Sequence, residues 1–414
     1  MKSRQHLNPK LTRRSWIVLT SAALTGCGGG GSGGISTSTS MAGSGSGGSG
    51  GSTSSTTGTT TGSGVSTAGA PGTGGTGVYQ GSITGFGSVI VNGVTYDNSQ
   101  AVMRLNDLVV SQDTLRLGMV ATVRGDRVAG STMGTASSIE VWSIAQGVVS
   151  EVRAGQFKVA GMTILTNAAT WLYGFAAEAP LSNGNYVSVW GLQADSEGHS
   201  WTASCVQAST ADAGAVSSGQ VSVEDGQRTL NGLRLTGTAA NSLVDGVLVR
   251  VQGTWSSSTS LQVVSTKSID SGVGVQPQDE VEIEGLVTTT PSATGFMLGH
   301  ITVQASPASY SPAGAQISVG SRVEVYGSWQ GGVLKATKVE LEDAMTPGLV
   351  EIKAPFQRYT SQADFVLQGQ RCDATGVVLS QSTTAALYKA GAVFKVKGTK
   401  NGDWLKVSSM ELDH

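Results

Sequence analysis

The stretch "LGMVATVRG" at residues 117–125 has four loose copies further along the chain. In each of the five copies two glycines stand seven positions apart, and a valine lies two positions before the second glycine. The residue four positions before that glycine is also apolar, whereas the intervening positions are mostly polar or amphipathic. A period of two with one apolar face predicts a half-buried β-strand. The copies are "NGNYVSVWG" at 183–191, "DGVLVRVQG" at 245–253, "VGSRVEVYG" at 319–327 and "AGAVFKVKG" at 390–398.

The segments around each copy recur in the same order. Upstream lies a pair of short apolar runs with a glycine between them, as in "VIVNGVTYD" at 89–97 and "RTLNGLRLT" at 228–236. Asn-Gly between apolar runs is a strong signal for a two-residue hairpin turn, because both turn positions need a positive φ. One further strand precedes each hairpin and another follows each copy. The predicted unit is therefore strand, hairpin, crossing segment, strand, loop and strand.

Five strands with a crossover between the third and fourth have the order of an OB-like barrel. The predicted fold is all-β, a tandem array of about five small five-stranded OB-like barrels after a disordered N-terminal tether. We expect the first glycine of each copy to start the fourth strand at a sharp bend, and the second to end it at the following loop. The crossing segment is expected to hold a short helix or a loop. In the third unit Gly232 and Gly246 lie only 14 positions apart, which leaves little room for a helix.

The predicted divisions of the chain follow from these repeats and from composition. They are a lipoprotein signal peptide at 1–26, a Gly/Ser/Thr-rich disordered tether at 27–77, and five barrels at 78–144, 145–210, 215–270, 279–343 and 348–414.

The first unit, "GSITGFGSVIVNGVTYD…LGMVATVRG", resembles the bacterial family known as domain of unknown function 5666. The resemblance is clear over 79–143, and the units at 145–208, 280–342 and 349–413 match its skeleton with poorer motifs. It implies an OB-like β-barrel in exported bacterial proteins. The chemistry of the family is unassigned, so the resemblance implies no functional residue.

The N-terminus resembles a bacterial lipoprotein signal. A basic stretch ends in "LTRRS", and the apolar run from Trp16 to Leu24 is too short to span a bilayer. "LTGC" at 24–27 resembles the lipobox, which implies that the Cys27 sulfur receives a diacylglycerol and that cleavage leaves Cys27 as the acylated N-terminus. Gly28 after the cysteine implies, by the same resemblance, anchoring in the outer membrane of a Gram-negative bacterium. "TRRSW" leaves both Sec and twin-arginine export open.

Charge and composition limit the kinds of partner that the protein is expected to bind. Removal of the leader takes away five basic residues and leaves 21 basic against 28 acidic residues, a net charge of −7. Such a body has no electrostatic attraction to nucleic acid or to an anionic membrane. Residues 28–77 are nearly all Gly, Ser, Thr and Ala, and cannot bury enough apolar area to offset chain entropy. The lipobox resemblance implies membrane lipid as a partner through acylated Cys27, and an envelope glycan or protein is a further expected partner.

Side chains with catalytic or metal-binding spacing are not found. The four histidines, His6, His199, His300 and His414, form no pair with ligand spacing, so no metal or cofactor is predicted. Alternation along "DEVEIE" at 279–284 places its carboxylates on one face, which we expect to be solvated. Cys205 and Cys372 lie in separate units, which favours buried free thiols over a disulfide.

Aromatic residues give a weak binding signal. Trp190, Tyr326 and Trp329 are placed near strands four and five, where they could stack on a sugar ring, and Phe86 lies in the "GFGS" loop. The alternative is that they cover barrel ends or form contacts between units. Tryptophans recur near these strands in every unit, at Trp142, Trp190, Trp255, Trp329 and Trp404.

The predicted function is that of a non-catalytic, lipid-anchored cell-envelope protein that acts as a binding or scaffolding module. Several copies of one small barrel suit a multivalent or spacing role. The first alternative is an envelope glycan-binding or glycan-processing protein. The second is single-stranded nucleic-acid binding through the OB-like barrels, which the negative charge disfavours.

Overall fold

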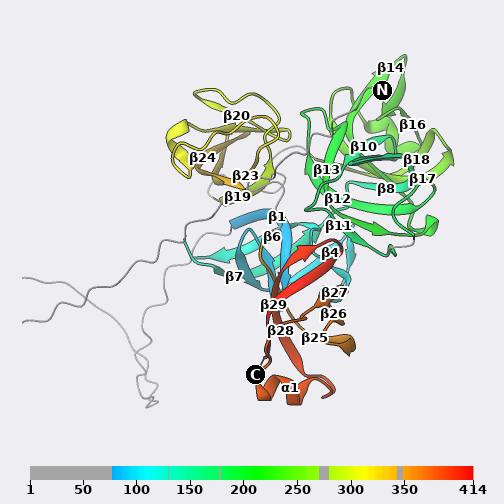
Figure 1. Ribbon diagram of the computed structural model, residues 1–414. Coiled ribbons are helices and arrows are strands. Elements are labelled where there is room, and N and C mark those ends of the chain that lie inside the picture. Colours follow the sequence, from blue (N-terminus) through cyan, green and yellow to red (C-terminus); the bar gives the residue numbers. More distant parts are fainter. Residues whose placement is uncertain (1–76, 129, 177–178, 270–278, 343–347, 414) are drawn as a thin grey trace, which may run out of the picture. The chain divides into compact units, whose positions relative to one another are not determined.

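The computed structural model describes residues 77–128, 130–176, 179–269, 279–342 and 348–413 (Figure 1). The predicted signal peptide, Cys27 and nearly all of the predicted tether lie outside these residues. The described chain consists of β-strands with four short 3-10 helices and a single α-helix, α1 (Gln381–Ala386). The prediction of an all-β fold is confirmed. Among the described residues, no helix has the length and apolarity needed to cross a membrane.

An 11-stranded sheet contains two closed five-stranded barrels. Its strands are β8 (Ala145–Arg153), β9 (Gln156–Val159), β10 (Met162–Leu165), β11 (Trp171–Tyr173), β12 (Tyr186–Gln193), β13 (Ser200–Ala208), β14 (Ala215–Glu224), β15 (Gln227–Leu230), β16 (Leu233–Thr236), β17 (Leu248–Ser257) and β18 (Ser260–Ser268). The first barrel closes in the order β8–β9–β10–β13–β12–β8, with β11 added beside β13. The second closes in the order β14–β15–β16–β18–β17–β14.

An 18-stranded sheet takes its strands from three further stretches of the chain. The first stretch holds β1 (Gly77–Phe86), β2 (Val89–Val91), β3 (Val94–Asp97), β4 (Val102–Leu105), β5 (Leu108–Val109), β6 (Val120–Arg127) and β7 (Met133–Val141). The second holds β19 (Glu280–Leu286), β20 (Gly295–Leu298), β21 (Ile301–Gln304), β22 (Tyr310–Ser311), β23 (Arg322–Gln330) and β24 (Val333–Glu342). The third holds β25 (Val350–Ser361), β26 (Asp364–Leu367), β27 (Gln370–Asp373), β28 (Val393–Asn401) and β29 (Trp404–Leu412).

Within these stretches the order of strand partners repeats that of the two barrels. The first stretch pairs as β1–β2–β3–β7–β6–β1, and the third as β25–β26–β27–β29–β28–β25. The second pairs as β20–β21–β24–β23–β19, and a single bridge between Val287 and Leu298 joins its ends.

Strand pairs also join stretches that the sequence places in different units. β1 runs parallel to β19, with Tyr79 opposite Glu282, and its last residues run parallel to β25, with Phe86 opposite Ile352. In the 11-stranded sheet β8 meets β14 through Gln146 and Val216. The sequence predicted separate barrels in a row, whereas the structure merges three of the five stretches into one sheet. The physical reason is that the first strands are long enough to offer backbone donors and acceptors beyond their own hairpin partners.

The opening glycine of each repeated phrase has the predicted role. Gly118 has a φ of 80° and lies two residues before β6. The equivalent glycines also have positive φ values and also lie two residues before their strands, at Gly184, Gly246, Gly320 and Gly391. The left-handed conformation disfavours residues with a Cβ atom, so glycine is selected there.

The closing glycine differs from its prediction, because it does not end the strand. β6 continues two residues beyond Gly125, and its register with β7 shifts between Arg124 and Gly125. The same shift occurs at the equivalent glycines Gly191, Gly253, Gly327 and Gly398. A Cβ atom on Gly125 would lie 2.0 Å from the carbonyl oxygen of Thr135 in β7. The residue is therefore a glycine because a β-bulge brings two backbones into close approach.

The predicted hairpin turns are confirmed where Asn-Gly marks them. Asn92 and Gly93 have φ values of 51° and 70°, and Asn231 and Gly232 have values of 50° and 78°. The crossing segments differ from the predicted short helix or loop. They hold strands in the first, second and fourth units (β4 and β5, β11, and β22), and a 3-10 helix at Thr238–Ser242 in the third. Among the described residues, the last unit alone has an α-helix there, α1, whose N-cap Ser380 accepts a hydrogen bond from the Thr383 amide.

Candidate functional site

The four aromatic residues singled out from the sequence do not form one site. Phe86 and Trp190 are buried at 1% and 2% exposure in one apolar cluster, and Trp329 is buried in another. Burial removes these three ring faces from solvent, which fits the alternative that they pack in cores and between units. Tyr326 is half-buried, and its hydroxyl donates to Glu324 Oε2 at 2.9 Å. Cys27 lies outside the described residues.

The two cysteines of the barrels are buried and unpaired, as predicted. Burial raises the pKa of the Cys372 thiol to about 12 and raises that of Cys205 further above its ordinary value. Thiols held in this protonated state are poor nucleophiles and poor metal ligands. Both belong to the same apolar cluster, where they act as small hydrophobic side chains.

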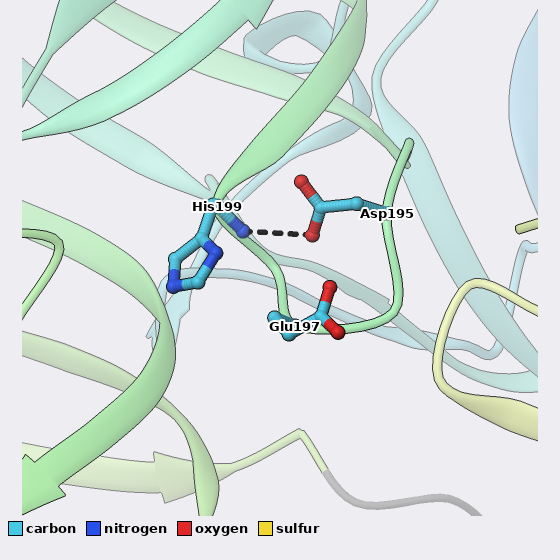
Figure 2. A group of neighbouring side chains, drawn as sticks. All are labelled: Asp195, Glu197 and His199. Atoms are coloured by element: carbon cyan, nitrogen blue, oxygen red, sulfur yellow. Dashed lines mark hydrogen bonds between the residues drawn. The ribbon is translucent and has the colours of Figure 1, made fainter.

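One group of potential metal ligands lies in the loop between β12 and β13. The ligand atoms of Asp195, Glu197 and His199 are within 4.8 Å of one another (Figure 2). The Asp195 carboxylate accepts hydrogen bonds from the His199 amide at 2.9 Å and from the Ser200 amide at 2.7 Å. These hydrogen bonds hold the loop between β12 and β13 in its conformation. The two carboxylates and the imidazole of the group are also suitable ligands for a divalent cation. The D-x-E-x-H spacing is present in the sequence, but a prediction based on pairs of histidines misses it, because a single histidine and two carboxylates make up the group.

The acidic strand β19 contradicts the prediction of a solvated face. Glu282 has no exposed surface, and Glu284 is 4% exposed. Arg127 from β6 contacts both Glu280 and Glu282, with nitrogen–oxygen distances of 2.7 Å. Glu284 pairs with Arg322 at 2.5 Å and accepts a hydrogen bond from the Ser82 amide at 2.6 Å.

The cause is the parallel pairing of β1 with β19. Alternation does place these carboxylates on one face, because the intervening Val281 and Ile283 lie in an apolar cluster. The pairing brings the first unit against that face, where Arg127 contacts Glu280 and Glu282 and the Ser82 amide donates to Glu284, so the face is an interface and not a solvated surface. We call Arg127, Glu280, Glu282 and Glu284, with the β1–β19 pair, the acidic joint.

Burial raises the pKa values of carboxyl groups in and beside the acidic joint. For Glu282 burial is the largest cause, and the Arg127 guanidinium opposes it. Beside it on β23, burial and then repulsion from Glu342 raise the pKa of Glu324 to about 8. The acidic joint is thus a costly arrangement that depends on its arginine, because an isolated charge in such a place would be strongly destabilising.

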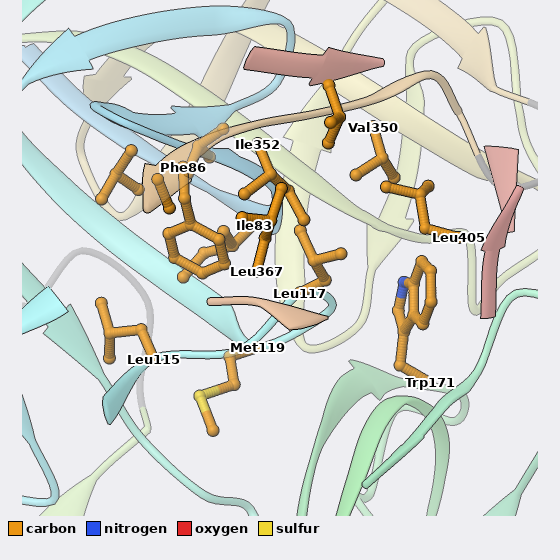
Figure 3. Close-up of a cluster of buried hydrophobic side chains, with 14 of the residues drawn as sticks. Ile83, Phe86, Leu115, Leu117, Met119, Trp171, Val350, Ile352, Leu367 and Leu405 are labelled. Atoms are coloured by element: carbon orange, nitrogen blue, oxygen red, sulfur yellow. The ribbon is translucent and has the colours of Figure 1, made fainter. Parts of the chain in front are cut away.

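An apolar cluster gives a second connection between stretches far apart in the chain (Figure 3). It unites side chains of the first, second and last units, such as Ile83, Trp171 and Ile352. Tyr173 belongs to this cluster, and its hydroxyl donates to Gln370 Oε1 at 2.9 Å; both residues are buried. We call this cluster the common core. Its packing resembles a domain interior more than a contact between independent domains.

Comparison with known protein families identifies two domains in the chain. Residues 146–207 and 284–340 match the family described as domain of unknown function (DUF5666), so the chain carries DUF5666 domains at these two regions. The first unit, where the resemblance had been clearest, lies outside both matches. No curated protein matches the chain.

Among solved structures, drosophila Unr CSD456 is similar at 11% identity over 64% of this chain and 98% of that chain, with a TM-score of 0.14. A TM-score this low supports no inference about this chain.

Proposed function

We propose that this protein is a non-catalytic scaffold of the bacterial cell envelope, exported and held at the outer membrane by acylated Cys27. Five OB-like barrels of one topology would form its body. The N-terminal lipobox resemblance supports the anchor, and the repeated order of strand partners supports the equivalence of the five units. The proposed partner is an envelope protein or glycan held at a fixed place by that body.

The observation that carries this proposal is that the units are joined by buried contacts. The acidic joint links the first and fourth units, and the common core links the first, second and last. The second and third units share the hydrogen bond from Ser217 Oγ to the Ala160 carbonyl, at 2.9 Å. Opening any of these contacts would expose apolar surface to water or leave a buried polar group without a hydrogen-bond partner. Both changes cost free energy.

A joined body suits a scaffold better than a set of independent binding modules. Barrels on flexible linkers sample many separations, so their binding sites gain only a modest effective concentration. Barrels that share strands and a core keep their outer faces at fixed separations. Such a body can hold a partner in one orientation, with the ordering cost already met during folding.

The anchor is tested by metabolic labelling with palmitate. We expect the native chain to incorporate label and to fractionate with membranes, and Cys27→Ser to lose both, because the acyl chains are the proposed attachment. Cys205→Ser is the matched control and should label like the native chain, since Cys205 is buried. Equal labelling of Cys27→Ser and the native chain would contradict the proposal.

The joined body is tested by equilibrium unfolding of the full chain in urea. Tryptophan fluorescence and far-ultraviolet circular dichroism should give one coincident transition, because tryptophans are spread over all five units and the units share buried contacts. Two or more separated transitions would show that the units unfold independently, and the scaffold proposal would then fail.

A further inference from the structure

A cavity of about 230 Å³ borders the β1–β19 pair, where Val78, Gln80 and Ile283 line it. Its wall includes Glu140, Trp142, Arg250 and Lys267, with apolar side chains such as Ile283 beside them. These residues come from the first, third and fourth units. We propose that this cavity binds a small anion through a carboxylate or phosphate group, which goes beyond the scaffold function.

Arg250 is the first reason. The residue is 5% exposed, and its hydrogen-bond acceptors are neutral: the Ser143 carbonyl at 2.7 Å from Nε, and Asn106 Oδ1 at 2.9 Å and Ser143 Oγ at 3.4 Å from Nη2. Among the described residues no carboxylate forms an ion pair with it, and Nη1 donates no hydrogen bond. Asp107 acts on it only as a more distant charge. A buried cation in this state is destabilising until a counter-charge arrives.

Lys267 adds a second cation to the same wall. Its Nζ atom lies 3.5 Å from the ring centroid of Trp142, and the Arg250 guanidinium carbon lies 5.1 Å from it. Both cations therefore contact one indole, which favours positive charge over its face. The nearest carboxylate oxygen, Glu140 Oε2, is 3.8 Å from Nζ, which is too long for a hydrogen bond. The lining of the cavity holds three cations, Arg124, Arg250 and Lys267, against the carboxylate of Glu140. Asp107 acts on Arg250 and Lys267 from further away, so the wall keeps an excess of positive charge.

The arrangement specifies the ligand chemistry. The open donors are Nη1 of Arg250 and the ammonium of Lys267, and charge-assisted hydrogen bonds to an oxyanion are the strongest that these groups make. The volume is below the roughly 300 to 1,000 Å³ of sites for drug-sized ligands, so the anion must be compact. Apolar residues in the same lining, Val78, Val120 and Ile301, suit a short carbon body attached to the anionic group.

The test is calorimetric titration of the full chain at constant ionic strength. The probes are inorganic phosphate, acetate and glucuronate, which separate a free phosphate from a simple carboxylate and from a sugar acid. We expect saturable binding of at least one probe, and at least tenfold weaker binding by Lys267→Met. Lys335→Met, which removes an exposed lysine on β24, should bind like the native chain.

A second variant is expected to bind the anion more tightly, a result that misfolding cannot produce. Glu140→Gln removes the carboxylate that competes for Lys267, so it should bind the anion about threefold to tenfold more tightly. Thermal unfolding of each variant checks that it is folded. No saturable binding of any probe, or equal affinities in Lys267→Met and the native chain, would overturn the anion site. Neither result would affect the palmitate and unfolding tests of the scaffold.

Discussion

Gly125→Ala should lower the free energy of unfolding by about 3 kcal/mol, the upper range for overpacking a tight site. The added methyl carbon would lie 2.0 Å from the Thr135 carbonyl oxygen and 2.9 Å from its carbonyl carbon. Both atoms belong to the backbone of β7, so no side-chain rotation relieves the contact. The bulge must open or the two strands must separate.

The measurement is urea unfolding of the full chain, with the midpoint and slope compared between variants. Gly348→Ala is the matched control, because a Cβ atom there meets no heavy atom within 4 Å. It should change stability by less than about 0.5 kcal/mol. A Gly125→Ala chain as stable as the Gly348→Ala chain would mean that the closing glycine is not required by the bulge.

Arg127→Met should destabilise the fold by about 3 to 5 kcal/mol, because it leaves a buried carboxylate without its counter-charge. Glu282 has no exposed surface, and its ion-pair contact within 4 Å is to Arg127. The Arg127 guanidinium also lies 4.8 Å from the ring centroid of Tyr79, so that contact is lost as well. The variant should therefore loosen the contact between β1 and β19 before the rest of the fold.

A second substitution separates the buried charge from lost packing. The double variant Arg127→Met/Glu282→Leu should be more stable than Arg127→Met alone, since it also removes the buried carboxylate that has lost its counter-charge. Arg358→Met breaks an ion pair with Asp364 in which the arginine is 48% exposed, and should cost far less stability than Arg127→Met, because exposed ion pairs are screened by solvent. If Arg127→Met costs no more than Arg358→Met in the same urea experiment, the acidic joint does not hold the units together.

The local features of the fold were predictable because their causes are local. Asn92 and Gly93 adopt positive φ whatever surrounds them, and the opening glycines precede their strands for the same reason. The closing glycines were placed correctly in the sequence but given the wrong role. Glycine is required at these positions because a backbone carbonyl of the neighbouring strand lies too close for a Cβ atom. The pattern within a single strand carries no information about that neighbour.

The sites were less predictable than the strands. Trp142 was noted only as one of a series of tryptophans, and its importance arises from Arg250 and Lys267, which are more than a hundred positions away. Likewise, the alternation of "DEVEIE" correctly predicted carboxylates on one face. No residue near them in the sequence indicated that Arg127 would be their ion-pair partner.

The sequence by itself determined the five recurring strands of each unit, their inward faces, the hairpin turns and the repeat, because periodicity and backbone preference act over a few residues. The tertiary structure alone decided which outward faces are covered, which charges meet and where a cavity remains. The physical reason is that the pairing of β1 with β19 and the filling of the common core depend on contacts between residues some 200 or more positions apart, as Ser82 and Glu284 show. At such separations a short sequence pattern carries no information about the partner.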